Sequence, residues 1–120
     1  MENTEKRHYA VIDPYLRKLT LSYCGQTVVE TTKALILKEV GKTVYNPVFY
    51  VPKEDVVMAL NPEDRSSHCP IKGDASYWNM DDVTDDYFAW SYEEPLPRAK
   101  KIKGYMAFNL NYLVFHSEPI

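Results

Sequence analysis

The chain has 120 residues, of which 45% are hydrophobic and 13% aromatic, and its formal net charge at pH 7 is −3. This length and composition predict one soluble globular domain over residues 1–120, with enough apolar surface to form a core. The acidic balance argues against a dedicated nucleic-acid binder, and the sequence lacks the run of about 20 apolar residues that a membrane-spanning helix needs.

The N-terminal half predicts short strands joined by turns. Residues 1–7 are polar and predict a tail outside the fold. In residues 17–23 apolar and polar side chains alternate, which is typical of a half-buried strand, and residues 24–26 predict the turn of a hairpin. Residues 53–60 fit either one helical turn or a brief strand, and residues 61–64 (Asn-Pro-Glu-Asp) have the composition of a turn. Further strands are expected at residues 9–12, 27–30, 33–40 and 48–51.

Residues 75–80 and 87–92 predict a second hairpin, with residues 81–86 as its loop. The alternation does not fix its register. If Trp78 lies opposite Trp90, both indoles point to one face of the sheet, whereas a one-residue slip pairs Tyr77 with Trp90.

The remaining C-terminal residues predict a short helix and a last pair of strands. Residues 97–103 begin with Pro, which suits a first helical turn, and Gly104 follows as a stop. Residues 105–108 and 112–115 are apolar and aromatic and predict the two strands. The whole pattern predicts a mainly β fold of antiparallel strands with one or two short helices.

The cysteines, histidines and aspartates predict no metal site. Cys24 and Cys69 are the two cysteines, and no Cys-x-x-Cys pair is present to hold zinc. The aspartates of residues 81–86 lack the spacing of a calcium loop, and we interpret them as a solvated hairpin tip. We therefore expect no metal and no other cofactor. The sequence also lacks an apolar signal segment, so we expect a cytoplasmic protein with reduced thiols.

Charge is segregated along the chain. Residues 51–95 contain three Lys or Arg and eleven Asp or Glu, whereas residues 96–120 contain four Lys or Arg and one acidic residue. We interpret this as an acidic middle that is compensated by basic flanks within the fold.

The densest group of chemically capable side chains lies in residues 68–78, which read His-Cys-Pro-Ile-Lys-Gly-Asp-Ala-Ser-Tyr-Trp. Pro70 favours an extended conformation at Cys69, and Gly73 suits a backbone conformation that other residues avoid. A turn that feeds a strand is predicted here. Its side chains then alternate, so Lys72, Asp74 and Trp78 are predicted to share one wall, which Trp90 completes.

Three residues of this stretch are candidate catalytic groups. Cys69 is a candidate nucleophile that Lys72 would activate, and the alternative is an inert buried thiol. Lys72 would bind an anionic group while Asp74 acts as a base or hydrogen-bond acceptor. The alternative is that Asp74 satisfies amides of the turn and that Lys72 is solvated.

Candidate ligand-binding residues surround them. An aromatic cleft for a flat or cationic ligand is one interpretation of Trp78, Trp90, Tyr77 and Tyr92, and ordinary core packing is the other. The polar candidate beside them is an imidazole. The set is Trp78, Trp90, Tyr92 and His68.

Five segments of the chain carry a family resemblance. They are Leu37-Lys38-Glu39-x-Gly41, Tyr50-x-Pro52-x-x-Asp55-Val56, Cys69-Pro70-x-Lys72-Gly73-Asp74-Ala75-x-Tyr77-Trp78, Ala89-Trp90-Ser91-Tyr92 followed by Pro95, and Ile102-x-Gly104-Tyr105-x-Ala107-Phe108. In this order, over about residues 16–115, they resemble domain-of-unknown-function family 427, whose members are small, mostly bacterial proteins. The resemblance implies a β-tent-like fold of two antiparallel sheets that meet at an angle around a pocket. We add Tyr50, Lys53, Asp55 and Glu39 as ligand-binding candidates.

Two functions stay open on the sequence. In the first, the protein binds a small-molecule ligand, with or without enzymatic activity, in a pocket lined by residues 68–78 and Trp90. In the second, it is a non-catalytic protein-interaction module in which these residues are structural. No nucleic acid or membrane is expected as a partner. The ligand, the reaction and the oligomeric state do not follow from the sequence.

Overall fold

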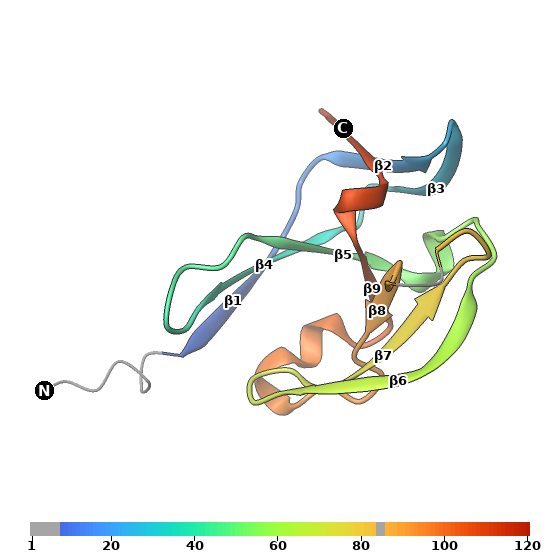
Figure 1. The fold of residues 1–120 in the computed structure, drawn as a ribbon. Helices are drawn as coiled ribbons and strands as arrows, with labels where there is room; N and C mark the ends of the chain where they lie inside the picture. The colour runs from blue at the N-terminus through green and yellow to red at the C-terminus, as the bar shows by residue number, and fades with distance from the viewer. Residues whose placement is uncertain (1–7, 84–85) are drawn as a thin grey trace, which may run out of the picture.

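The computed structural model of the chain describes residues 8–83 and 86–120. The predicted tail at residues 1–7 and residues 84–85 of the predicted acidic loop lie outside the described residues. Within the described part, the chain forms ten strands in two antiparallel sheets (Figure 1). The predicted mainly β fold of two antiparallel sheets is confirmed. Its helices are short 3₁₀ segments, and no helix of the described residues is long and apolar enough to cross a membrane.

The larger sheet has seven strands in the order β1-β4-β5-β9-β8-β7-β6, and the smaller has three in the order β10-β2-β3. The strands of the larger sheet are β1 (Tyr9–Pro14), β4 (Leu35–Val40), β5 (Val48–Pro52), β6 (Asn61–Cys69), β7 (Gly73–Asn79), β8 (Ala89–Ser91) and β9 (Tyr105–Phe108). The smaller sheet contains β2 (Lys18–Tyr23), β3 (Gln26–Thr31) and β10 (Val114–Glu118), and the 3₁₀ segments are η2 (Lys53–Asp55), η3 (Pro97–Ile102) and η4 (Leu110–Tyr112).

The hairpin of β2 and β3 follows from its sequence pattern. Leu19 and Leu21 are buried, while Thr20 between them is only partly covered. Cys24 and Gly25 form the turn with φ angles of 49° and 82°, in the left-handed region that Gly adopts at little cost. The predicted hairpin is confirmed, and Cys24 lies exposed at its tip.

The turn predicted at residues 61–64 is wrong, because β6 begins there. Pro62 is tolerated because β6 is an edge strand, where a missing N–H breaks no central ladder, and the pairing with β7 shifts register between Pro62 and Ser66. Most β6 side chains are polar and exposed, so the strand carries no apolar alternation. The turn from β6 to β7 is present, and Gly73 adopts a φ of 110°.

The last two strands do not pair with each other as predicted. β9 lies between β5 and β8 in the larger sheet, whereas β10 pairs with β2 in the smaller one. Asn109 ends β9, because its side chain accepts a hydrogen bond from the backbone N–H of Asn111 at 3.1 Å and so caps η4. The chain passes from one sheet to the other at η4 (Figure 1).

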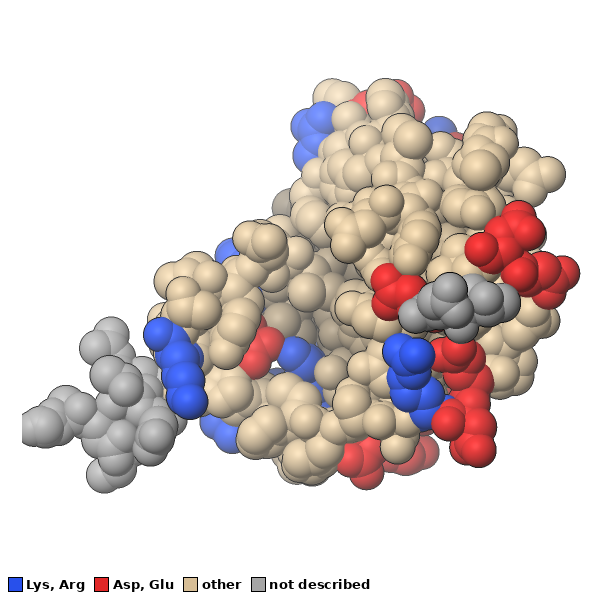
Figure 2. All heavy atoms as spheres, viewed as in Figure 1, with Lys and Arg blue, Asp and Glu red and all other residues tan. Residues whose placement is uncertain are grey.

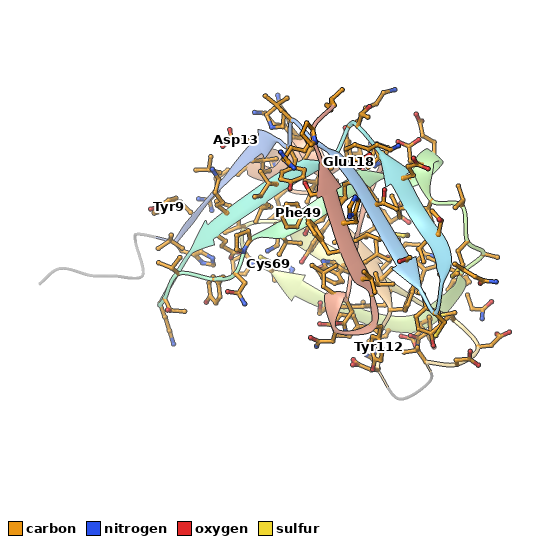
Figure 3. All side chains as sticks on the ribbon, turned by 90° about the horizontal axis from the view of Figure 1, so that it is seen from above. Tyr9, Asp13, Phe49, Cys69, Tyr112 and Glu118 are labelled. Carbon is orange, nitrogen blue, oxygen red and sulfur yellow. The ribbon has the colours of Figure 1, made fainter. Side chains whose placement is uncertain are left out.

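Two buried cores lie on opposite faces of the larger sheet. The inter-sheet core joins it to the smaller sheet, and Phe49 of β5 packs there on Phe115 of β10 with ring centroids 4.9 Å apart (Figure 3). The opposite face, which we call the inner face, packs against η3 through Ala99 and Ile102. The buried residues of the inner face are Ile12, Leu37, Tyr50, Ala75, Tyr92, Ala99, Ile102 and Ala107.

Candidate functional site

The register of the β7–β8 hairpin separates the two tryptophans. Tyr77 lies opposite Trp90, and Trp78 lies opposite Ala89. Because successive side chains of a strand point to opposite faces, Trp78 and Trp90 lie on different sides of the sheet. Trp90 packs on the inner face, and Trp78 packs against the inter-sheet core. The prediction that Lys72, Asp74 and Trp78 form one wall with Trp90 is therefore wrong.

A row of aromatic side chains crosses the inner face instead. Tyr50 pairs with Ala107, Ala107 with Trp90, and Trp90 with Tyr77, so these residues follow one line across β5, β9, β8 and β7. Tyr87 extends the row, because its ring lies 5.5 Å from that of Trp90 and 5.3 Å from that of Tyr77. Tyr77 was among the residues predicted for an aromatic cleft, whereas Tyr87 was not a candidate.

A buried ion pair spans the inner face. Lys72 is 9% exposed, and its Nζ donates to Glu39 Oε1 at 2.7 Å. The second oxygen of Glu39 lies 2.7 Å from His8 Nε2, and Lys72 Nζ lies 5.7 Å from the centre of the Tyr92 ring. Figure 2 shows a hollow on this side of the molecule, with a Lys or Arg side chain beside an Asp or Glu side chain inside it.

The contact between Glu39 and Lys72 depends on the curvature of the larger sheet. Glu39 belongs to β4 and Lys72 to the turn before β7, and four strand spacings separate β4 from β7. In a flat sheet that distance would be about 19 Å, beyond the reach of the two side chains. The sheet therefore bends so that its two arms face each other around η3, as Figure 1 shows.

Glu39, Tyr50 and Tyr92 of the inner face have shifted pKa values. Desolvation by itself would raise the pKa of the Glu39 carboxyl, but hydrogen bonds from His8 and Lys72 outweigh it, and the pKa is lowered. Burial raises the pKa of the Tyr50 and Tyr92 phenols far above its ordinary value. At neutral pH the site therefore holds a carboxylate and two neutral phenols, which donate and accept hydrogen bonds.

Cys69 lies at the end of β6 and packs against the inner-face core as a half-buried thiol. It is the one predicted nucleophile, and its position beside Tyr50 and Tyr92 places it on the same side of the sheet as Lys72. Over residues 8–83 and 86–120, no group of three or more His, Cys, Asp or Glu is arranged to hold a metal ion.

The other predicted residues lie elsewhere. His68 and Asp74 form an exposed pair, with Nδ1 and Oδ1 2.8 Å apart and side chains that are 64% and 82% exposed. Asp55 accepts a hydrogen bond from the Thr31 hydroxyl at 2.7 Å and joins η2 to β3. The structure thus places these three side chains away from the buried pair, where the sequence had grouped them with Lys72.

Trp78 and Lys53 form a separate pair. Lys53 Nζ lies 5.1 Å from the centre of the Trp78 ring and also pairs with Glu93. The two line an open groove of about 250 Å³. The rest of its lining is apolar: Val56, Met58, Leu60 and Met106.

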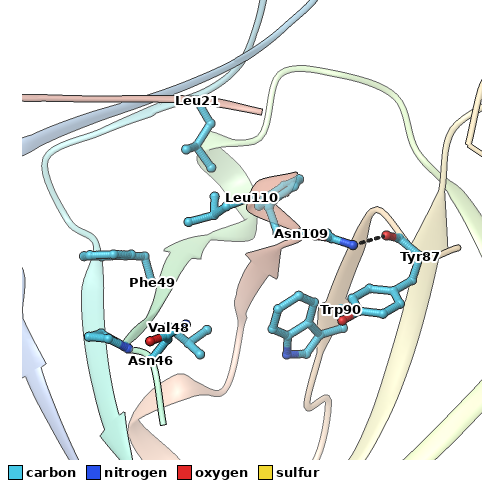
Figure 4. A pocket seen from close by; sticks show the side chains of 10 residues that line it. Leu21, Asn46, Val48, Phe49, Tyr87, Trp90, Asn109 and Leu110 are labelled. Carbon is cyan, nitrogen blue, oxygen red and sulfur yellow. Dashed lines mark hydrogen bonds between the residues drawn. The ribbon is translucent and has the colours of Figure 1, made fainter. Parts of the chain in front are cut away.

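A cleft of about 350 Å³ opens where β9 ends and the chain crosses to the smaller sheet (Figure 4). Phe49 and Trp90 lie on its two sides in Figure 4, and Leu21 and Leu110 close one end. Its polar groups are amides and a phenol, and the side chain of Asn109 donates to the carbonyl of Tyr87 at 3.1 Å. No local motif marks this cleft, because its walls come from segments far apart in the sequence.

The inner face therefore brings together some of the predicted catalytic and ligand-binding residues. It brings together Glu39, Tyr50, Cys69, Lys72, Trp90 and Tyr92. His8 was missed, and its position next to the polar tail gave no signal. Trp90 connects this cluster to the cleft, because it belongs to both.

Comparison with known proteins gives a family and no activity. No curated protein matches the chain. Residues 11–115 match the family described as domain of unknown function (DUF427), which is most of the length of the chain. The chain therefore belongs to the DUF427 family, whose function is unknown.

Proposed function

We propose that the protein binds a small molecule at the inner face, with Lys72 as the polar anchor and Trp90 as an aromatic wall. The observation that carries this proposal is the buried ammonium of Lys72. An ammonium has three N–H donors, and Glu39 accepts one of them at 2.7 Å. Among residues 8–83 and 86–120 no second acceptor contacts Lys72 Nζ, so its remaining donors are left for an acceptor on a ligand.

Burial of this ion pair supports a binding role over a purely structural one. Removing two charges from water costs several kcal/mol per ion, and an apolar pair of similar volume often stabilises a fold as well or better (~1–4 kcal/mol). His8 is a polar neighbour of Glu39, and the core residues of the inner face beside the pair are aromatic or apolar. Polar groups that converge among aromatic walls are typical of small-molecule sites.

The proposed ligand has an acceptor group and a flat apolar part. Its acceptor, such as a carboxylate or carbonyl oxygen, receives hydrogen bonds from Lys72 and from the neutral phenols of Tyr50 and Tyr92. Its apolar part packs on Trp90 and enters the cleft beside Phe49, because Trp90 belongs to both the inner face and the cleft. If the site is catalytic, Cys69 is the proposed nucleophile. Asp74 is a poor base for it, because Asp74 is exposed and pairs with His68 across the strands, on the opposite face from Cys69.

The test is a thermal-shift screen of metabolites, since a ligand specific for the folded state raises the melting temperature. We expect carboxylates with a planar ring to stabilise the wild type. Lys72→Met should abolish the shift, and Lys72→Arg, which keeps the charge and the partner Glu39, should weaken it. Trp78→Phe is the control, because Trp78 lies on the other side of the sheet and should leave the shift intact.

The proposal fails if no compound stabilises the wild type, or if the shift survives Lys72→Met and Trp90→Phe and is lost in Trp78→Phe. That second outcome favours the alternative function, a non-catalytic interaction module. The groove beside Trp78 supports the alternative, since it is mostly apolar and Val57 next to it is 68% exposed. Circular dichroism of each variant separates lost binding from lost folding.

A further inference from the structure

A second cleft, between β1 and η3, carries three cations. It has a volume of about 340 Å³ and is lined by Ala10, Val11, Ile12, Asp13, Pro97, Arg98, Lys100 and Lys101. This volume falls in the range of about 300–1,000 Å³ that is typical of small-molecule sites. Neither Lys72 nor Trp90 lines this cleft, so it is distinct from the site of the proposed function.

The cations of this cleft have no acidic partner in the described part of the chain. The acidic residue in the lining is Asp13, and Lys38 already pairs with it at 3.0 Å. Lys18, Lys38, Lys53, Lys72 and Lys103 pair with carboxylates. Within the described residues Arg98, Lys100 and Lys101 do not, and neither do Lys33 and Lys42, which lie outside the cleft. The positive charge of the cleft is therefore uncompensated locally, although the whole chain has a net charge of −3.

The packing of η3 against the sheet positions the side chains of Arg98, Lys100 and Lys101. Ala99 and Ile102 are buried against the inner face, at 1% and 0% exposure. The helical geometry of η3 is interrupted at Ala99, which has a φ of −118° and a ψ of 19°. Arg98, Lys100 and Lys101 are all exposed on either side of the two buried residues. The short helix therefore presents all three cations away from its anchored side.

β1 adds backbone donors to the cations. It is an edge strand of the larger sheet, so the N–H groups on its outer side have no strand partner. Residues 10–13 all line the cleft although their side chains alternate between two faces, which shows that the cleft follows the outer edge of the strand. Backbone N–H groups together with Arg and Lys are the donors that proteins use to hold phosphate oxygens.

We propose that this cleft binds a small molecule with two or more phosphate groups. Three cations match the charge of a diphosphate, and its oxygens accept hydrogen bonds from several donors at once. A nucleic acid fits less well, because the cations are confined to one six-residue segment and the chain is acidic overall. The cleft size and the compact charge favour a small polyanion.

The test is calorimetric titration of inorganic pyrophosphate into the full chain at fixed ionic strength. Lys100→Gln/Lys101→Gln should weaken binding about tenfold, because each lost exposed pairing is worth a few-fold in affinity. The matched control is Lys33→Gln/Lys42→Gln, which removes the same charge from two exposed lysines outside the cleft. This control should keep the affinity for pyrophosphate within about twofold. Exposed charges that lie farther from the bound anion than the Debye length are largely screened by salt.

Several results would overturn the proposal. No binding by the wild type refutes it, and an equal loss in both double variants reduces the effect to general electrostatic attraction. Binding that is lost in Lys72→Met but kept in Lys100→Gln/Lys101→Gln assigns the anion to the inner face. Tighter binding of hexaglutamate, lost in the η3 variant, identifies an acidic-peptide site in place of a phosphate site.

Discussion

Glu39 illustrates how single contacts decide the behaviour of a buried acid. Its side chain is 12% exposed, which by itself disfavours the carboxylate, yet both oxygens are held at 2.7 Å by His8 and Lys72. The hydrogen bonds outweigh desolvation and lower the pKa. The charged form is thus the stable form in the folded protein, and folding is coupled to the ionisation of this residue.

This coupling gives an expected pH dependence. A carboxyl whose pKa is lower in the folded state contributes stability above its ordinary pKa of 4.5 and loses that contribution as pH falls through the folded-state value. We expect Glu39→Gln to lower the free energy of unfolding most at pH 6, and the difference from wild type to shrink towards pH 3. Urea denaturation at a series of pH values measures this difference.

The control for this experiment is Glu94→Gln, because the Glu94 side chain is 86% exposed and lies 3.5 Å from Lys103. An exposed pair of this kind contributes at most about 1 kcal/mol, so the control should follow the wild-type profile closely. A Glu39→Gln difference that stays constant from pH 6 to pH 3 would contradict the assigned role of the ionised carboxylate.

At the scale of elements, the turn between β6 and β7 positions Lys72. The backbone N–H of Leu96 donates to the carbonyl of Lys72 at 2.9 Å, which ties the turn to the segment before η3. Gly73 follows with a φ of 110°, where a Cβ would lie 3.4 Å from the carbonyl oxygen of Glu94. The sequence predicted a special backbone at Gly73, and the structure confirms it.

We expect Gly73→Ala to destabilise the protein by about 2–3 kcal/mol, because a non-Gly residue is strained at this φ. Gly104→Ala is the matched comparison. Gly104 has a φ of 82°, closer to the left-handed region, and no atom lies within 4 Å of an added Cβ. This substitution should cost only about 1–2 kcal/mol. Chemical denaturation checks the order, and an equal or larger cost at Gly104 would contradict it.

At the scale of the whole molecule, the larger sheet carries both cores. Val51 and Met106 face the inter-sheet core, while their neighbours Tyr50 and Ala107 face the inner face. Neither face can lose its packing without exposing the shared strands. We therefore expect the two faces to unfold together.

The two tryptophans report on the two faces separately. In Trp78→Phe the remaining indole lies on the inner face, and in Trp90→Phe it lies against the inter-sheet core. For each variant, fluorescence and circular dichroism should show the same urea midpoint, since a two-state domain gives coincident transitions. A fluorescence midpoint that differs from the circular dichroism midpoint in either variant would indicate that the two faces unfold independently.

The sequence by itself determined most of the strands and the family. Alternation along residues 17–23 and the turn residues around Gly25 and Gly73 are local signals, and strand formation and turn conformation respond to local sterics. The same signals failed for β6, where polar residues cover an edge strand, and for β10, whose partner lies far away in the sequence.

Only the tertiary structure decided the site. Residues 68–78 contain the reactive side chains that the sequence pointed to, but these side chains do not share one site. In the observed register, Trp78 lies on one face of the sheet and Tyr77 on the other. The bend of the sheet then brings Glu39 to Lys72 across four strand spacings and leaves His68 and Asp74 in solvent. A period of two residues fixes which neighbours share a face, whereas partners, register and curvature depend on the packing of the whole chain.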